Sequence, residues 1–241
     1  MKNLSTYLES PFDDATITID QLAAFTTDHL GRLRAQNADG ALDDRVAATA
    51  AAMQAFDDAY TADMVATARR MGRKQAKRQF RHKLPKETGR LIAIVEAYFG
   101  KRSPEIHICL PRGRRGLARS TDDMLEENLG ALLKGLQSLE ATIGAQWVEM
   151  ATALRDEWRA IYTESESSTA GQTATADRLR RARRTLQWEL YRNLLEIALR
   201  YPRQPKKLSL YMMPYLLGKP QDFSGKRPRK RRTGPKPAQQ G

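Results

Sequence analysis

The sequence predicts an all-α protein: an antiparallel four-helix bundle made of two tandem, duplicated helical hairpins, followed by a disordered basic tail. Three observations predict it. Apolar residues recur at steps of 3 and 4 over long stretches, the chain matches itself at an offset of 102 residues, and charge alternates in blocks. A chain of 241 residues with 41% hydrophobic residues is long and apolar enough to bury a core.

The internal match sets the predicted domain boundaries. It holds without a gap from about residue 18 to residue 110. Coinciding pairs include Val46 and Val148, Phe56 and Trp158, Tyr60 and Tyr162, Thr61 and Thr163, and Ile108 and Leu210. We interpret the match as a duplication, although helical apolar spacing alone could produce accidental matches. The expected parts are an N-terminal arm (1–17), a bundle (18–218) with repeat one at 18–116 and repeat two at 120–218, and a tail (219–241).

In repeat one, Thr18 and Gln21 have the form of a helix capping box. The stretch 37–40 (Asn-Ala-Asp-Gly) is expected to break or kink the first helix, which would continue over residues such as 46–71. The second helix is basic at its start and apolar at its end, and Pro85 should kink it or delay its start.

In repeat two, a leucine-rich stripe with no internal breaker predicts one long helix from Leu125 to Ile161. The small, polar stretch 165–175 reads as the loop before the fourth helix. Short helical segments are expected at 104–110 and 205–217, although the alternation at 106–110 also suits a strand. Trp147, Trp158 and Trp188 fall on faces that we expect to be buried.

The net charge of +13 is distributed in alternating blocks. Their net charges are −7 for 1–66, +13 for 67–119, −7 for 120–166, +7 for 167–218 and +7 for 219–241. Two basic ridges follow from this pattern, one formed by Arg70, Arg73 or Lys74, Lys77 and Arg81, the other by the arginines of 178–184. They could bind a phosphate backbone, or the neighbouring acidic helices could neutralise them.

No catalytic or cofactor motif is evident, so we expect a non-enzyme without cofactors or a small-molecule substrate. Phosphate-loop and dinucleotide fingerprints are absent, and the three histidines have no His or Cys neighbours at metal-binding spacing. The single cysteine, Cys109, excludes an internal disulfide. Without a membrane-spanning run or a signal peptide, we expect a cytoplasmic protein.

The basic tail carries the strongest functional signal. Its run 226–232 contains six basic residues in seven, flanked by Gly and Pro, which suits an extended arm that follows phosphates. Other anionic partners and a merely solubilising role stay open. The residues we expect to contact nucleic acid are Lys226, Arg227, Arg229, Lys230, Arg231, Arg232, Arg112, Arg114 and Arg115.

The stretches 151–156 (Ala-Thr-Ala-Leu-Arg-Asp), 186–195 (Leu-Gln-Trp-Glu-Leu-Tyr-Arg-Asn-Leu-Leu) and 103–105 (Ser-Pro-Glu), with the tandem layout, resemble a group of bacterial helical proteins without an assigned function. This resemblance implies a fold and a bacterial source, but no activity. The leading hypothesis is therefore sequence-independent binding of DNA or RNA through the tail and the basic ridges. The alternatives are a protein-interaction or structural scaffold with charge-segregated helices and, third, an enzyme or ligand-binding bundle.

Overall fold

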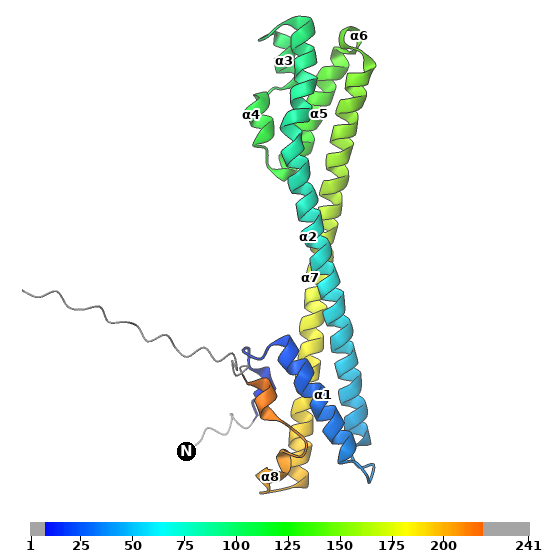
Figure 1. Cartoon of the computed structure of the whole chain (residues 1–241), viewed down its shortest axis with the longest axis vertical. Coiled ribbons are helices and arrows are strands. Elements are labelled where there is room, and N and C mark those ends of the chain that lie inside the picture. The colour runs from blue at the N-terminus through cyan, green and yellow to red at the C-terminus, as the bar shows by residue number, and fades with distance from the viewer. Residues whose placement is uncertain (1–7, 219–241) are drawn as a thin grey trace, which may run out of the picture. The chain divides into compact units, whose positions relative to one another are not determined.

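The structure is a computed structural model that describes residues 8–218, and every regular element in that range is helical (Figure 1). The predicted all-α class is therefore confirmed. The chain forms two compact units, each built from two separate stretches. Within the described range, unit 1 comprises 8–53 and 185–218, and unit 2 comprises 54–184.

Two long helices, α2 (Asp43–Phe99) and α7 (Ala145–Arg200), contribute to both units. Each replaces two shorter helices of the predicted hairpins, so the four-helix count is not confirmed. The predicted loop 165–175 lies inside α7, because its hydroxyl groups bond to the carbonyls of the preceding turn. Ser168 donates to the Ser165 carbonyl at 2.8 Å, and Thr173 donates to the Thr169 carbonyl at 3.1 Å. Pro85 also lies within a continuous helix.

The chain reverses in the segments that precede the long helices. The predicted break at 37–40 is confirmed: the Asn37 side chain donates to Asp43 and accepts from the Leu42 amide at the start of α2. The uninterrupted helix expected from Leu125 to Ile161 is wrong. It breaks around α6 (Glu140–Ile143), where Gly144 has φ +97°, a backbone angle that side chains with a Cβ rarely adopt.

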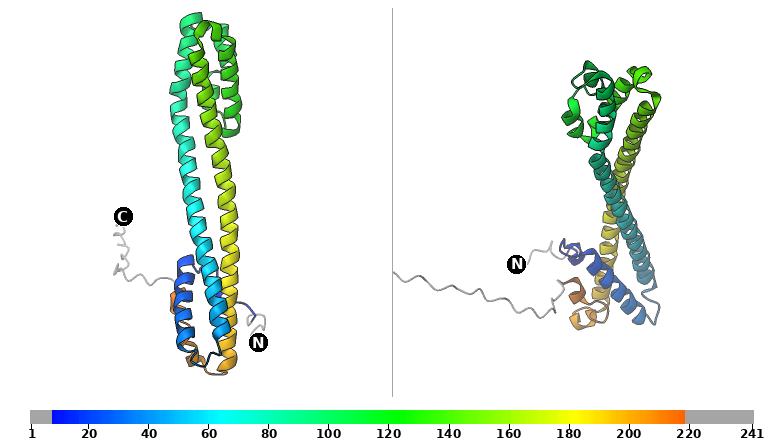
Figure 2. Two further views of the ribbon diagram at one scale, coloured as in Figure 1. Left: turned by 90° about the vertical axis from the view of Figure 1, so that its right-hand side faces the viewer. Right: turned by 45° about the horizontal axis from the view of Figure 1, so that its top comes forward.

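Unit 2 is organised around the antiparallel pairing of α2 and α7 (Figures 1 and 2). Phe80 and Trp158 meet in its core with ring centroids 5.2 Å apart. Helix α5 (Asp122–Ser138) adds its leucine stripe to this core, and α3 (Pro104–Cys109) packs against α5. A Cβ at Gly135 would lie 2.6 Å from the Cys109 Cα, so glycine permits this close approach.

Unit 1 contains α1 (Ile19–Ala35), η2 (Pro11–Asp13), α8 (Pro205–Leu208) and η3 (Pro214–Leu217) with the ends of the two long helices. The predicted capping box starts α1, since Thr18 and Gln21 bond reciprocally at 3.2 and 2.8 Å. A polar cluster occupies its core: the Asn193 amide lies 2.7 Å from Thr49 Oγ1 and 3.0 Å from His29 Nε2.

Element lengths recur along the chain in the order that the offset predicts. Helices α1 and α5 have 17 residues each, α2 has 57 and α7 has 56. A short helix follows each long one, and the connecting turn contains an arginine with positive φ, Arg102 (72°) or Arg203 (62°). These regularities agree with a duplication, whose boundaries stay a prediction.

Candidate nucleic-acid interface

The basic residues of α2, among them the predicted ridge, divide into two sets of side chains in unit 2. One set is bound by carboxylates of α5 and α7. Its ion pairs are Arg73 with Glu164, Lys77 with Asp122 (3.3 Å) and Glu166 (3.2 Å), Arg81 with Asp122 (2.7 Å), and Lys83 with Glu157. This part of the ridge therefore faces protein carboxylates.

Charge complementarity between α2 and α7 explains these pairs. The basic second half of α2 lies against the acidic first half of α7, as antiparallel pairing requires. Asp122 is the most connected carboxylate. Burial raises its pKa, but the hydrogen bonds from Arg81 and Lys77 outweigh burial and hold that pKa below its usual value. The internal neutralisation that the charge blocks suggested is therefore present for part of the ridge.

The other set consists of Arg70, Lys74 and Arg78, which are exposed. Within residues 8–218 no carboxylate lies at ion-pair distance from any of the three. Their spacing of four residues places them within about 80° of one another around α2, at 100° per residue. They form a basic row on one side of the helix.

A second basic face lies on α4 (Gly113–Ala118), which the sequence analysis placed in the junction between repeats. Arg112, Arg115 and Arg119 are exposed at steps of 3 and 4, so they share one face of this short helix. No carboxylate of the described part of the chain pairs with them. By contrast, Arg114 donates to Glu96 of α2 at 2.7 Å, which holds α4 on α2.

The basic row on α2 precedes the part of α2 that lies beside α4. A cleft of about 240 Å³ separates α4 from α2, and its lining residues are Leu84, Pro85, Thr88, Gly89, Arg114, Arg115, Leu117 and Ala118. On α2, Arg70, Lys74 and Arg78 lie about two to four helical turns before Leu84 of that lining. We call these three residues together with Arg112, Arg115 and Arg119 the basic strip. Sequence reasoning missed Arg119, although its spacing from Arg115 could have indicated it.

The remaining predicted basic residues are less informative. In the second ridge, Arg180 pairs with Asp177 at 2.8 Å, Arg181 and Arg183 have interaction partners, and Arg178 and Arg184 are exposed. The predicted tail residues Lys226, Arg227, Arg229, Lys230, Arg231 and Arg232 lie outside the described residues.

The three tryptophans test a further expectation. Trp158 is fully buried and Trp147 is half-buried, but Trp188 is 55% exposed, so the expectation of burial is wrong for Trp188. Its position on α7 points away from the leucines that α7 buries. Cys109 is buried, and burial raises its pKa to about 11, which disfavours the thiolate.

Searches of residues 8–218 for metal and membrane features give two findings. No group of three or more His, Cys, Asp and Glu side chains there could hold a metal ion. No helix in that range combines the length and apolar character needed to cross a bilayer.

The fold and the basic strip define the class of the protein: it is an all-helical protein with a solvent-exposed basic surface. The chain matches no known protein family, no curated protein and no solved structure.

Proposed function

We propose that this chain is a non-enzymatic, nucleic-acid-associated protein that binds the phosphate backbone of DNA or RNA. The observation that carries the proposal is the division of the basic residues. Lys77 and Arg81 of α2 have carboxylate partners, whereas the six residues of the basic strip are exposed and have no carboxylate partner among residues 8–218. A row of cations whose charge the protein leaves uncompensated favours an external polyanion.

The geometry of the strip suits a phosphate backbone. The strip places three cations, Arg70, Lys74 and Arg78, over about 12 Å of α2 at 1.5 Å per residue, and three more on and beside α4. A polyanion lying along it would meet cations at successive helical turns. These contacts are to phosphates rather than to base edges, so the binding should be independent of sequence. The tail run 226–232 adds six basic residues to the same function.

Binding should depend steeply on salt. If all six side chains of the basic strip neutralise phosphates on duplex DNA, the log–log slope is about −5. Affinity would then fall about 10³-fold between 50 and 200 mM salt. Fluorescence anisotropy with labelled duplex DNA, single-stranded DNA and RNA measures this slope and ranks the three ligands.

A matched pair of variants tests the assignment. Arg70→Ala/Lys74→Ala/Arg78→Ala should weaken binding and make the slope shallower by about 2.7. The control, Arg34→Ala/Lys134→Ala/Lys206→Ala, removes the same charge from other exposed positions and should have little effect. A chain ending at Gly218 separates the tail from the strip. Equal losses in the two triple variants would contradict the strip, and no binding by the full chain at 50 mM salt would overturn the proposal.

We also propose that the protein is cytoplasmic and of bacterial origin. A scaffold role is the second candidate, and one specific feature favours it: unit 1 exposes an apolar helix face, with Trp188 at 55% and Leu199 at 80% exposed.

A further inference from the structure

Helix α7 carries two rows of side chains in unit 1, on opposite sides. The inner row, Leu186, Leu190, Asn193 and Ile197, is buried. The outer row is Trp188, Arg192, Leu195 and Leu199. Both rows have steps of 4, 3 and 4 residues, and they lie about 160° apart around the helix. A helix with two such rows can pack against a helix on each side.

The outer row is apolar and exposed. Trp188, Leu195 and Leu199 are 55%, 42% and 80% exposed. Surface leucines are common singly, but three large apolar side chains within three turns of one face indicate an interaction surface. The positions 102 residues earlier are also exposed, but they hold Lys86, Arg90, Ala93 and Ala97. The apolar character therefore belongs to unit 1 alone.

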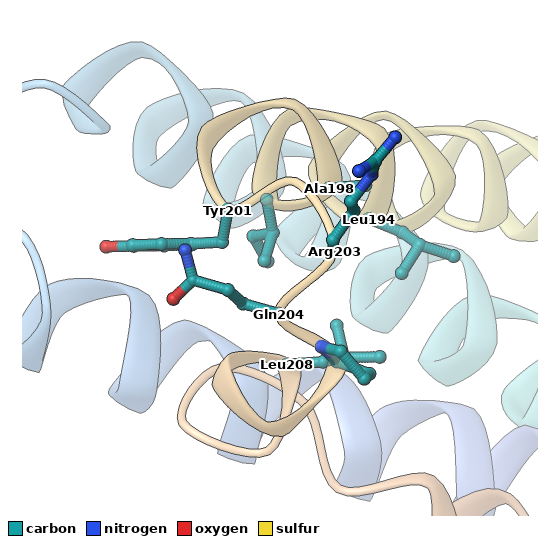
Figure 3. A pocket seen from close by; sticks show the side chains of 8 residues that line it. Leu194, Ala198, Tyr201, Arg203, Gln204 and Leu208 are labelled. Atoms are coloured by element: carbon teal, nitrogen blue, oxygen red, sulfur yellow. The ribbon is translucent and has the colours of Figure 1, made fainter.

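The apolar surface continues into a groove at the end of α7. This groove of about 250 Å³ is lined by Leu194, Ile197, Ala198, Tyr201, Arg203, Gln204, Pro205 and Leu208 (Figure 3). Ala198 is exposed and follows Leu195 by three residues, so it joins the groove to the outer row. The groove widens the apolar surface beyond a single line of side chains.

We propose that the outer row is a homodimer interface, occupied by the same row of a second copy of this chain. The step pattern 4, 3, 4 is palindromic, so a twofold axis between Arg192 and Leu195 superposes the row on itself in antiparallel orientation. Trp188 then faces Leu199 of the second copy, which pairs the largest side chain of the outer row with the most exposed leucine of that row.

Charge complementarity favours the same register. Arg192 faces Leu195 of the second copy and lies next to Glu196 of that copy, so symmetry gives two intermolecular ion pairs. Arg192 can leave its present partner, because Glu189 also binds Arg45 at 3.2 Å. Glu196 is available because its contact with Arg200 is long, at 3.8 Å, and Arg200 also donates to the Ala41 carbonyl.

The interface is short. Residues 188–199 extend about 17 Å along the helix, which offers less than the roughly 800 Å² per partner of a standard interface. The dimer is therefore expected to be weak and reversible.

Sedimentation velocity of the full chain from about 1 to 200 µM tests the interface. The unaltered chain should pass from monomer to dimer, and Leu195→Glu/Leu199→Glu should weaken the dimer at least tenfold. Ala93→Glu/Ala97→Glu is the matched control, with the same charge added at the exposed counterpart positions, and should dimerise normally. Circular dichroism verifies that both variants are helical. A chain that stays monomeric at 200 µM, or a dimer that both variants leave intact, overturns the interface.

A charge exchange tests the antiparallel register. Arg192→Glu brings two carboxylates together across the axis and should weaken the dimer at least tenfold. Arg192→Glu/Glu196→Arg restores opposite charges and should recover affinity to within about threefold of the unaltered chain. A double variant no tighter than the single variant contradicts this register.

Discussion

The cores of the two units differ at three positions that lie 102 residues apart in the sequence. Unit 1 holds His29, Thr49 and Asn193, and unit 2 holds Ala131, Ala151 and Leu91 at the corresponding positions. The three polar residues are buried and hydrogen-bonded to one another. Similar helix lengths thus enclose a polar cluster in one unit and an apolar core in the other.

This difference indicates which kind of interaction stabilises the core of each unit. Unit 2 relies on packing, since leucines from α5 and aromatic residues from α2 and α7 form one continuous cluster. In unit 1 the polar cluster must be fully bonded to avoid a desolvation penalty. It is nearly so: His29 Nδ1 donates to the Tyr211 carbonyl at 2.8 Å, but Asn193 Oδ1 has no hydrogen-bond partner in the described part of the chain. Removing one member of this cluster should therefore cost more than removing all of them.

The largest expected effect lies in the apolar core. Trp158→Ala should reduce the free energy of unfolding by about 3–5 kcal/mol, because it leaves a cavity among Phe80 and its neighbours. Urea denaturation at neutral pH measures this loss. Trp188→Ala is the control, because an exposed tryptophan should change the stability of the monomer by about 0.5 kcal/mol or less. Similar losses in the two variants would mean that Trp158 does not anchor the core.

Exchanging the polar cluster for its apolar counterpart should have a smaller effect. Asn193→Leu alone should cost about 1–3 kcal/mol, because it leaves His29 Nε2 buried without a hydrogen bond. The triple variant His29→Ala/Thr49→Ala/Asn193→Leu reproduces the residues of unit 2. It removes the unpaired His29 Nε2 but also the donor to the Tyr211 carbonyl, so it should recover part of that loss. Denaturant midpoints of the two variants test this order. A triple variant less stable than the single one would show that the cluster is a net source of stability.

Much of this architecture follows from the sequence, and the exceptions have local causes. Leucine spacing predicts α5, because leucines at steps of 3 and 4 place one apolar face on a short amphipathic helix. The segment 165–175 misleads because Ser and Thr favour loops until their hydroxyl groups bond the preceding turn. Composition indicates that basic residues gather on α2, but not which of them meet carboxylates. That depends on where the carboxylates of α5 and α7 lie, so only the folded chain distinguishes Arg81, which binds Asp122, from Arg78, which is exposed.

Acid should affect unit 1 through its histidine. Burial lowers the pKa of His29 from 6.5, against the opposing effects of the Tyr211 carbonyl and Asp28. The unfolded chain therefore binds a proton that the folded unit does not. Stability should be full above pH 6.5 and should fall as the pH drops below it.

Thermal unfolding between pH 7.5 and 5 measures this dependence. The triple variant that lacks His29 should lose the His29 component of the slope, while the exposed histidines His82 and His107 are retained in both chains. An unchanged slope in the triple variant would assign the pH dependence to other groups.

The smallest expected effect concerns the ion pairs that orient α2 against α5 and α7. Asp122→Asn should cost about 1 kcal/mol or less, because the carboxylate is partly exposed and solvent screens its attraction to Arg81 and Lys77. Its lowered pKa means that this contribution is present at neutral pH and is lost as the pH falls through the acidic range below 3.8.

The more informative readout of Asp122→Asn is nucleic-acid affinity. Asp122→Asn leaves Arg81 without its carboxylate and Lys77 with Glu166 as its one remaining ion-pair partner, so binding at 50 mM salt should tighten while the fold is retained. Glu127→Asn removes the same charge at an exposed site of α5 where no ion pair involves the residue. Equal tightening in both variants would show that net charge, rather than the local release of Arg81, governs binding.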